Sequence, residues 1–100
     1  MGKAVVFGSF VVDLMARTPH LPIPGETVKG LVFKKGAGGK GFNQCVAAHK
    51  AGADVTMITK LGRDSFADEA LNVMKELKMP QDHLFFSEEV ETGIALILVD

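Results

Sequence analysis

The sequence has 100 residues, of which 47% are hydrophobic and 23% are charged, and its formal net charge is −1. This length and composition fit one globular domain and exclude a largely disordered chain. The near-zero charge provides no basic surface for nucleic acid or an anionic membrane, so we expect neither as a partner and favour a small-molecule site. No apolar run is long enough to span a membrane or to serve as a signal peptide, and the single cysteine, Cys45, has no partner for an internal disulfide. Together these features predict a reducing, cytoplasmic setting.

The first expected element is a strand over residues 3–8, a continuous apolar run that Gly8 ends. Such runs are typical of parallel strands buried on both faces, and we expect this strand at the centre of the sheet. Asp13 follows as the only acid in a long apolar stretch, just beyond the expected carboxyl end of the strand. Ligands of open α/β sheets bind at that edge, so Asp13 is a candidate acceptor for substrate hydroxyls. The alternative is an aspartate that caps a turn.

Residues 18–27 hold three of the four prolines, which exclude a helix because proline lacks the N–H donor and fixes φ. The following segment, residues 27–34, alternates imperfectly and carries lysines, as an exposed edge strand or two short strands would. We expect this segment to project from the main sheet as a β-flap.

A glycine-rich segment, residues 36–41, then leads directly into an apolar-periodic stretch. Glycines allow positive φ and leave N–H groups bare at the start of a helix, where an anion or a hydroxylated ligand can approach. A P-loop is excluded, because its pattern needs Ser or Thr after Lys40 and an earlier glycine where this sequence has lysine. The glycine spacing satisfies the dinucleotide-binding fingerprint, but two lysines precede it instead of a buried strand. A dinucleotide-binding site stays open as a distant alternative.

The middle of the chain predicts helix, strand and helix in turn. Residues 42–51 are helix formers with Gly52 as the stop, and residues 55–61 read as a strand. Either Asp64 or Ser65 can N-cap the second helix. The apolar stripe of this helix is interpreted as core and comprises Phe66, Ala67, Ala70, Leu71, Met74 and Leu77.

Two apolar segments end the sequence. Residues 84–86 predict a short strand, and residues 91–100 predict a longer one at which the sequence stops without a turn, which we interpret as a truncation. The alternation of strands and helices predicts a three-layer α/β domain with right-handed crossovers. We also expect residues 27–33 and 92–99 to pair as strands of one projecting sheet, because neither segment can bury its apolar face alone.

Five motifs, in order along the chain, resemble the ribokinase-like (PfkB) family of carbohydrate kinases. They are Gly8-Ser9 with Asp13, Pro24-Gly25-Glu26-Thr27, Gly38-Gly39-Lys40-Gly41-Phe42-Asn43-Gln44, Leu61-Gly62-Arg63-Asp64 and Thr92-Gly93-Ile94-Ala95. Several unlinked matches in the right order are more specific than any one of them. The resemblance covers nearly the whole chain and is to the N-terminal third of such a kinase.

The resemblance implies a three-layer, doubly wound, mostly parallel α/β sheet with a projecting β-sheet lid. Residues 1–100 would be the N-terminal part of that single domain, with lid strands at about 14–35 and 92–100. The implied reaction is transfer of the ATP γ-phosphoryl group to a sugar hydroxymethyl oxygen, with Mg²⁺ and with a monovalent cation as a further candidate cofactor. The lid also implies a homodimer.

The resemblance assigns substrate-binding roles to five residues. Asp13 and Asn43 would bind sugar hydroxyls, Gly38 and Gly39 would make backbone contacts, and Lys40 would be a polar contact near the substrate. The catalytic aspartate and the ATP pocket are expected downstream, so no catalytic or metal-binding residue is expected here and the chain alone should be inactive.

The identity of the acceptor stays open at the sequence level. Val11 stands two residues before Asp13, where many ribokinases carry asparagine, so one sugar hydrogen bond is absent or made elsewhere. Phe42 replaces a usually small residue. A nucleoside kinase of the same family, or a non-catalytic association module, is the alternative function.

Overall fold

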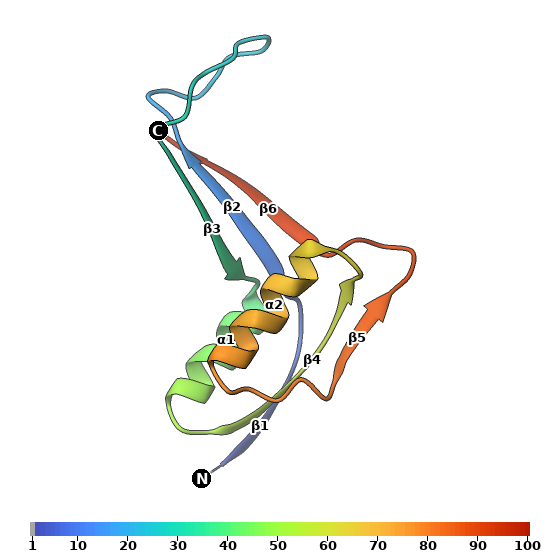
Figure 1. The fold of residues 1–100 in the computed structure, drawn as a ribbon. Helices are drawn as coiled ribbons and strands as arrows, with labels where there is room; N and C mark the ends of the chain where they lie inside the picture. Colours follow the sequence, from blue (N-terminus) through green and yellow to red (C-terminus); the bar gives the residue numbers. More distant parts are fainter. Residues whose placement is uncertain (1) are drawn as a thin grey trace.

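The computed structural model describes residues 2–100, which form six strands and two helices (Figure 1). The first sheet consists of β1 (Lys3–Phe7), β4 (Asp54–Gly62) and β5 (Leu84–Ser87), all parallel and in the order β1-β4-β5. Strand β4, and not the first strand, is therefore central among these three. The predicted strands at 3–8, 55–61 and 84–86 are confirmed to within a residue or two at their ends.

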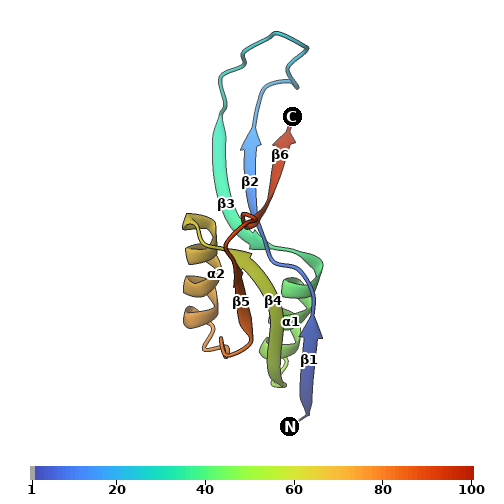
Figure 2. The ribbon, with the colours of Figure 1, turned by 90° about the vertical axis from the view of Figure 1, so that its right-hand side faces the viewer.

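Two helices, α1 (Lys40–Lys50) and α2 (Ser65–Glu76), lie on one side of this sheet (Figure 2). The buried side chains of β4, Val55, Met57 and Leu61, alternate along the strand and so share the face that the helices cover. Phe7 and Phe85 on the opposite face are 85% and 55% exposed. Within residues 2–100 the helices thus cover one face of the sheet, which gives two of the three predicted layers.

A second sheet projects away from the first (Figure 1). It contains β2 (Val11–Arg17), β3 (Val32–Gly38) and β6 (Gly93–Val99) in the order β3-β2-β6. Strand β2 runs antiparallel to β3 and parallel to β6. We call these three strands the lid sheet; the proline-rich segment, residues 18–31, forms its tip.

The lid sheet corrects two predictions about the strands. The segments 27–33 and 92–99 do contribute to one sheet, but they do not pair with each other, because β2 lies between their strands. Asp13 lies beyond the end of β1 as expected but within β2, so the alternative of an aspartate that caps a turn is wrong. Sequence patterning missed β2 because its residues are apolar except for Asp13 and Arg17 and show no alternation of polar and apolar positions.

The glycine-rich segment also differs from the prediction. Strand β3 starts at Val32, later than expected, and includes Gly36 and Gly38. Within residues 36–41 only Gly39 has a positive φ, 99°. Gly36 and Gly38 are therefore part of a paired strand, and Gly39 provides the sharp change of direction between β3 and α1.

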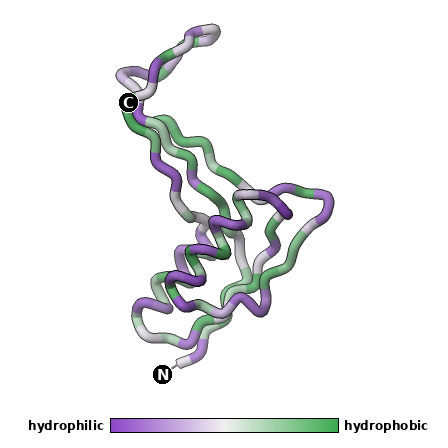
Figure 3. The backbone as a smooth tube through the Cα atoms, viewed as in Figure 1, coloured by the Kyte–Doolittle hydropathy of each residue, from purple (hydrophilic) through white to green (hydrophobic). Residues whose placement is uncertain are grey.

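Apolar residues continue along β6 and along most of β2, whereas β3 carries Lys34, Lys35 and two glycines (Figure 3). Strand pairing places four exposed apolar side chains on one face: Phe33, Ile94, Leu96 and Leu98. We call this the back face; Asp13 points to the opposite, front face, because successive side chains of a strand alternate. No helix in the described part of the chain is long and apolar enough to cross a membrane.

Candidate functional site

Asp13 lies in the middle strand of the lid sheet, opposite Gly36 on β3 and Ala95 on β6. Its side chain leans toward the next front-face position on β3, Gly38. A Cβ atom built on Gly38 would lie 2.5 Å from Asp13 Oδ2 and 2.9 Å from its Cγ atom. The half-buried carboxylate thus lies directly over the Gly38 backbone, and only glycine leaves room for it.

Gly39 joins the lid sheet to α1 and occupies the N-cap position of that helix. Its positive φ disfavours other residues, and a Cβ atom there would also lie 2.6 Å from the carbonyl oxygen of Ser9. Because Gly39 has no side chain, no side-chain hydrogen bond caps α1, and its first turn contains no acid. The helix start therefore presents N–H groups and partial positive charge to the neighbouring space.

Gly8 and Gly41 bring the end of β1 against this helix start. A Cβ atom on Gly41 would lie 2.8 Å from Gly8 Cα, and one on Gly8 would lie 2.9 Å from Gly41 Cα. The Phe42 N–H donates to the Ser9 carbonyl oxygen at 3.1 Å. The carboxyl end of β1, the start of β2 and the start of α1 thus meet at one edge of the parallel sheet, where α/β proteins bind ligands.

Lys40 and Asn43 both lie exposed in the first turn of α1, three positions apart. Asn43 also lines a groove of about 460 Å³ between α1 and α2, together with Val73 and Leu77. Across residues 2–100, no hydrogen bond links Asp13 to Lys40 or Asn43. The structure brings Asp13, Gly38 and Gly39 together and leaves the two polar side chains exposed at the adjacent helix start.

A second polar cluster surrounds Asp64, which is confirmed as the N-cap of α2: its Oδ1 atom accepts the Ala67 N–H at 2.9 Å. The same carboxylate accepts the Thr92 N–H at 2.9 Å through Oδ2 and the Thr92 hydroxyl at 2.8 Å through Oδ1. The hydrogen bond from the Thr92 N–H is the main cause that lowers the pKa of Asp64 below its usual value. The sequence suggested the cap but not the contact with Thr92, which lies 28 residues away.

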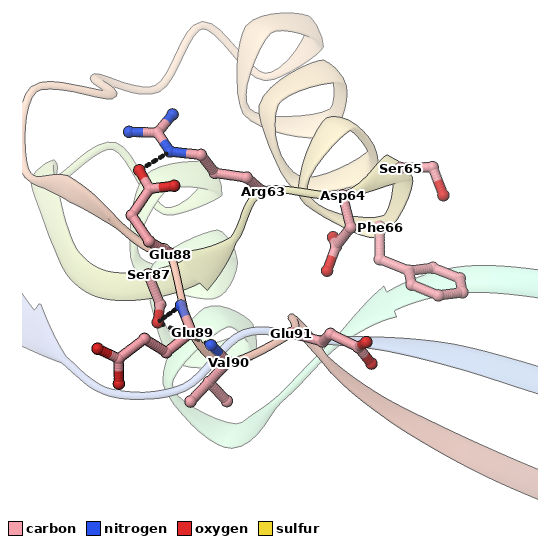
Figure 4. Close-up of a pocket in the computed structure, with 9 residues that line it drawn as sticks. All are labelled: Arg63, Asp64, Ser65, Phe66, Ser87, Glu88, Glu89, Val90 and Glu91. Carbon is pink, nitrogen blue, oxygen red and sulfur yellow. Dashed lines mark hydrogen bonds and ion pairs between the residues drawn. The ribbon is translucent and has the colours of Figure 1, made fainter.

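A pocket of about 440 Å³ adjoins this cluster at the carboxyl ends of β4 and β5 (Figure 4). Arg63 forms an ion pair with Glu88, and its guanidinium lies 5.1 Å from the centre of the Phe86 ring. The acidic loop of residues 88–91 lines the other side. With one arginine already paired and several carboxylates nearby, the pocket does not favour a phosphate group. In the part of the chain described, no three His, Cys, Asp or Glu side chains gather closely enough to hold a metal ion.

Comparisons with known proteins concern the family and the fold of this chain. Residues 1–100 match the family model described as pfkB family carbohydrate kinase. Ribokinase of Mus musculus is 38% identical over 96 residues, which cover 96% of this chain and 30% of the relative. A deoxyribokinase of Salmonella typhi is 42% identical over 98 residues, which cover 95% of this chain and 31% of the relative.

A solved structure shows the same fold. Arabidopsis thaliana ribokinase complexed with ribose and ATP superposes with a TM-score of 0.88 at 26% identity, covering 98% of this chain and 32% of that one. This chain thus spans about a third of the length of these relatives. The predicted ribokinase-like α/β fold with its projecting lid is confirmed, and the family match over the entire sequence shows that the chain belongs to the pfkB family of carbohydrate kinases.

Proposed function

We propose that the full-length protein is an ATP-dependent carbohydrate kinase that transfers the γ-phosphoryl group to a sugar hydroxymethyl oxygen, and that this chain supplies the acceptor site and the lid. The observation that carries the proposal is the Asp13 carboxylate, held over bare backbone at Gly38 beside the uncapped start of α1. A carboxylate next to the N-terminal end of a helix without a side-chain cap suits a polyhydroxylated ligand, because the ligand both donates and accepts hydrogen bonds.

In this proposal Asp13 accepts hydrogen bonds from two sugar hydroxyls and orients the acceptor. Gly38 and Gly39 leave room for the Asp13 carboxylate and for the close turn at Ser9, and their backbone groups would contact the sugar. Lys40 and Asn43 make polar contacts from the helix start. Such groups accelerate the reaction mainly by alignment, which is the principal protein contribution to phosphoryl transfer along with charge neutralisation.

The nucleotide and its metal ion lie mainly against residues outside this chain in the proposed enzyme. ATP would supply the phosphoryl group and Mg²⁺ would neutralise its charge. Within residues 2–100, the pocket beside Asp64 is lined by Glu88, Glu89 and Glu91, whose charges would repel the phosphates of ATP. This chain's own contribution is to bind the acceptor and cover it.

Val11 bears on which acceptor is used. It shares the front face with Asp13 and lies between Gly38 on β3 and Gly93 on β6, so its isopropyl group borders the carboxylate. A substrate hydroxyl buried against this side chain without a hydrogen-bond partner would weaken binding by about 1–3 kcal/mol. This favours an acceptor that lacks a hydroxyl at that position, and ribose, 2-deoxyribose and a nucleoside form the panel that tests it.

The proposal is tested by steady-state kinetics of the full-length protein with ATP, Mg²⁺ and this panel. Asp13→Ala should lower kcat/KM for the best sugar at least about tenfold, mostly through KM, because a charge-assisted hydrogen bond contributes about 1.5–3 kcal/mol. Asp82→Ala, which removes an exposed aspartate from the loop before β5, is the matched control and should leave the kinetics unchanged. Wild-type protein that phosphorylates none of the panel, or equal kinetics for the two variants, would refute the assignment.

The lid sheet also supports a homodimer as part of this proposal. Its back face carries Phe33, Ile94, Leu96 and Leu98, all exposed, and Leu96 is 77% exposed. Monomeric proteins seldom expose a contiguous apolar strip of this kind, and a second copy of the same sheet would cover it.

A further inference from the structure

Two hydrogen bonds between the half-buried Asp64 and the buried Thr92 join the two sheets of the molecule. Asp64 follows β4 of the parallel sheet and caps α2, whereas Thr92 immediately precedes β6 of the lid sheet. Thr92 is 6% exposed; its N–H and hydroxyl donate to Asp64, and its hydroxyl oxygen accepts the Gly62 N–H at 2.9 Å.

The backbone at the end of β4 also packs tightly against the residues that precede β6. A Cβ atom on Gly62 would lie 2.6 Å from Thr92 N and 2.7 Å from Glu91 Cα, so the end of β4 passes directly against the start of β6. The segment from Ser87 is also ordered, because the Ser87 hydroxyl oxygen accepts the N–H groups of Glu89 and Val90 at 3.1 and 3.0 Å (Figure 4). The first residue of β6 is therefore fixed relative to α2.

Strand β6 in turn sets the position of Asp13. Gly93 pairs with Val11 and Ala95 pairs with Asp13 in the parallel ladder between β6 and β2. Apolar side chains of β2 and β3 also pack on the core that α2 shares. Among the described residues, the other polar side-chain link between the lid sheet and α2 is the ion pair of Lys35 with Glu69 at 2.6 Å, but both side chains are about a third or more exposed. Exposed pairs contribute little, so the buried contact at Thr92 is the stronger of the two.

We propose that Asp64 is a positioning residue for the acceptor site: by binding Thr92 it fixes the start of β6 and, through the β6–β2 ladder, the place at which Asp13 meets the sugar. This inference rests on the proposed sugar-kinase function. It assigns Asp64 a role beyond the helix cap, and it makes Thr92 the residue through which that role is exerted.

Two substitutions separate the cap from the positioning role. In Asp64→Asn, an amide oxygen can still cap α2 by accepting the Ala67 N–H, but the amide NH₂ replaces the oxygen that accepts the Thr92 N–H and so meets another donor. Thr92→Val keeps the shape and removes the hydroxyl, and Thr92→Ser restores the hydroxyl. The matched controls are Asp68→Asn, an exposed acid in the first turn of α2, and Thr56→Val, a half-buried threonine on β4.

The experiment uses the full-length protein and has two arms. In hydrogen exchange, Asp64→Asn and Thr92→Val should accelerate exchange in peptides covering β2 and β6 but not in peptides covering β4, whereas Thr92→Ser and the controls match the wild type. In kinetics, the same two variants should lower kcat/KM for the sugar by between about tenfold and a hundredfold through its KM, the range expected for a misplaced binding group, with the KM for ATP unchanged.

Each outcome decides the inference. Lid exchange equal to that of the controls would refute the anchoring of β6, and faster lid exchange with unchanged sugar KM would refute the link to Asp13. A wild-type protein without kinase activity would refute the proposed function and with it the positioning role, and the exchange arm would still decide whether Asp64 holds the lid sheet.

Discussion

Replacing Gly38 by alanine tests the central geometry of the site. The new methyl group would lie 2.5 Å from Asp13 Oδ2, closer than a carbon and an oxygen can approach, so the carboxylate must turn away. The side chain can do so at small cost to folding, because Asp13 is only half-buried and alanine suits a strand better than glycine. We therefore expect the free energy of unfolding to change by less than about 1 kcal/mol.

The effect on the acceptor should be much larger. Loss of one charge-assisted hydrogen bond costs about 1.5–3 kcal/mol, which corresponds to roughly a 10- to 150-fold lower kcat/KM for the sugar. The assay is sugar saturation at fixed, saturating ATP, followed by release of ADP, with urea unfolding of the same samples.

Gly36→Ala is the matched control for Gly38→Ala, because Gly36 lies on the same strand and the same face with no atom within 4 Å of its Cβ position. If both alanine variants show the same sugar kinetics, the carboxylate over Gly38 does not bind the acceptor and the site must be placed elsewhere.

Two further predictions concern the lid and the cap. Leu96→Lys on the back face should convert a dimer of the full-length protein to a monomer in light scattering after size exclusion, whereas Val90→Lys, an equally exposed position outside the lid sheet, should not; a persistent Leu96→Lys dimer would exclude the back face as the interface. Because the folded-state pKa of Asp64 is lowered, its carboxylate stabilises the protein fully above the unfolded value of about 3.9, and this contribution is lost as the pH falls through the folded-state pKa. The difference in unfolding free energy between wild type and Asp64→Asn should thus shrink as urea unfolding is repeated from pH 6 down to about 3, and a constant difference would contradict the assigned cause.

Sequence patterning succeeded where one local signal decided the structure. The continuous apolar run of β1, Gly52 after α1 and the Asp64 cap each determine a strand or a helix end through nearby residues, and all three agree with the structure. The stripe of α2 was also correct, with Ala67, Ala70 and Met74 buried.

The strands of the lid sheet could not be predicted from local sequence, because their pairing partners lie far along the chain. The Gly8-Ser9 pair before β2 marks the end of β1 but does not indicate a new strand, and the pairing of β2 with β6 joins residues about 80 positions apart. The glycines of β3 suggested a loop, although Gly38 is required by the Asp13 side chain on the neighbouring strand. The substrate-binding roles of Asp13, Gly38, Gly39, Lys40 and Asn43 stay predictions that the variants above test.

The order of strands in the lid sheet has a consequence for synthesis on the ribosome. Strand β2 can pair with β3 soon after both emerge, but its other edge waits for β6, which follows about 80 residues later. At about 5–20 residues per second, that edge stays open for about 4–16 s during translation. Open apolar edges are templates for pairing with other chains, and here Val12, Leu14 and Ala16 would lie beside the gap. The nascent chain therefore passes through a stage in which one edge of the strand that carries Asp13 is open to pairing with other chains, and completion of β6 ends that stage.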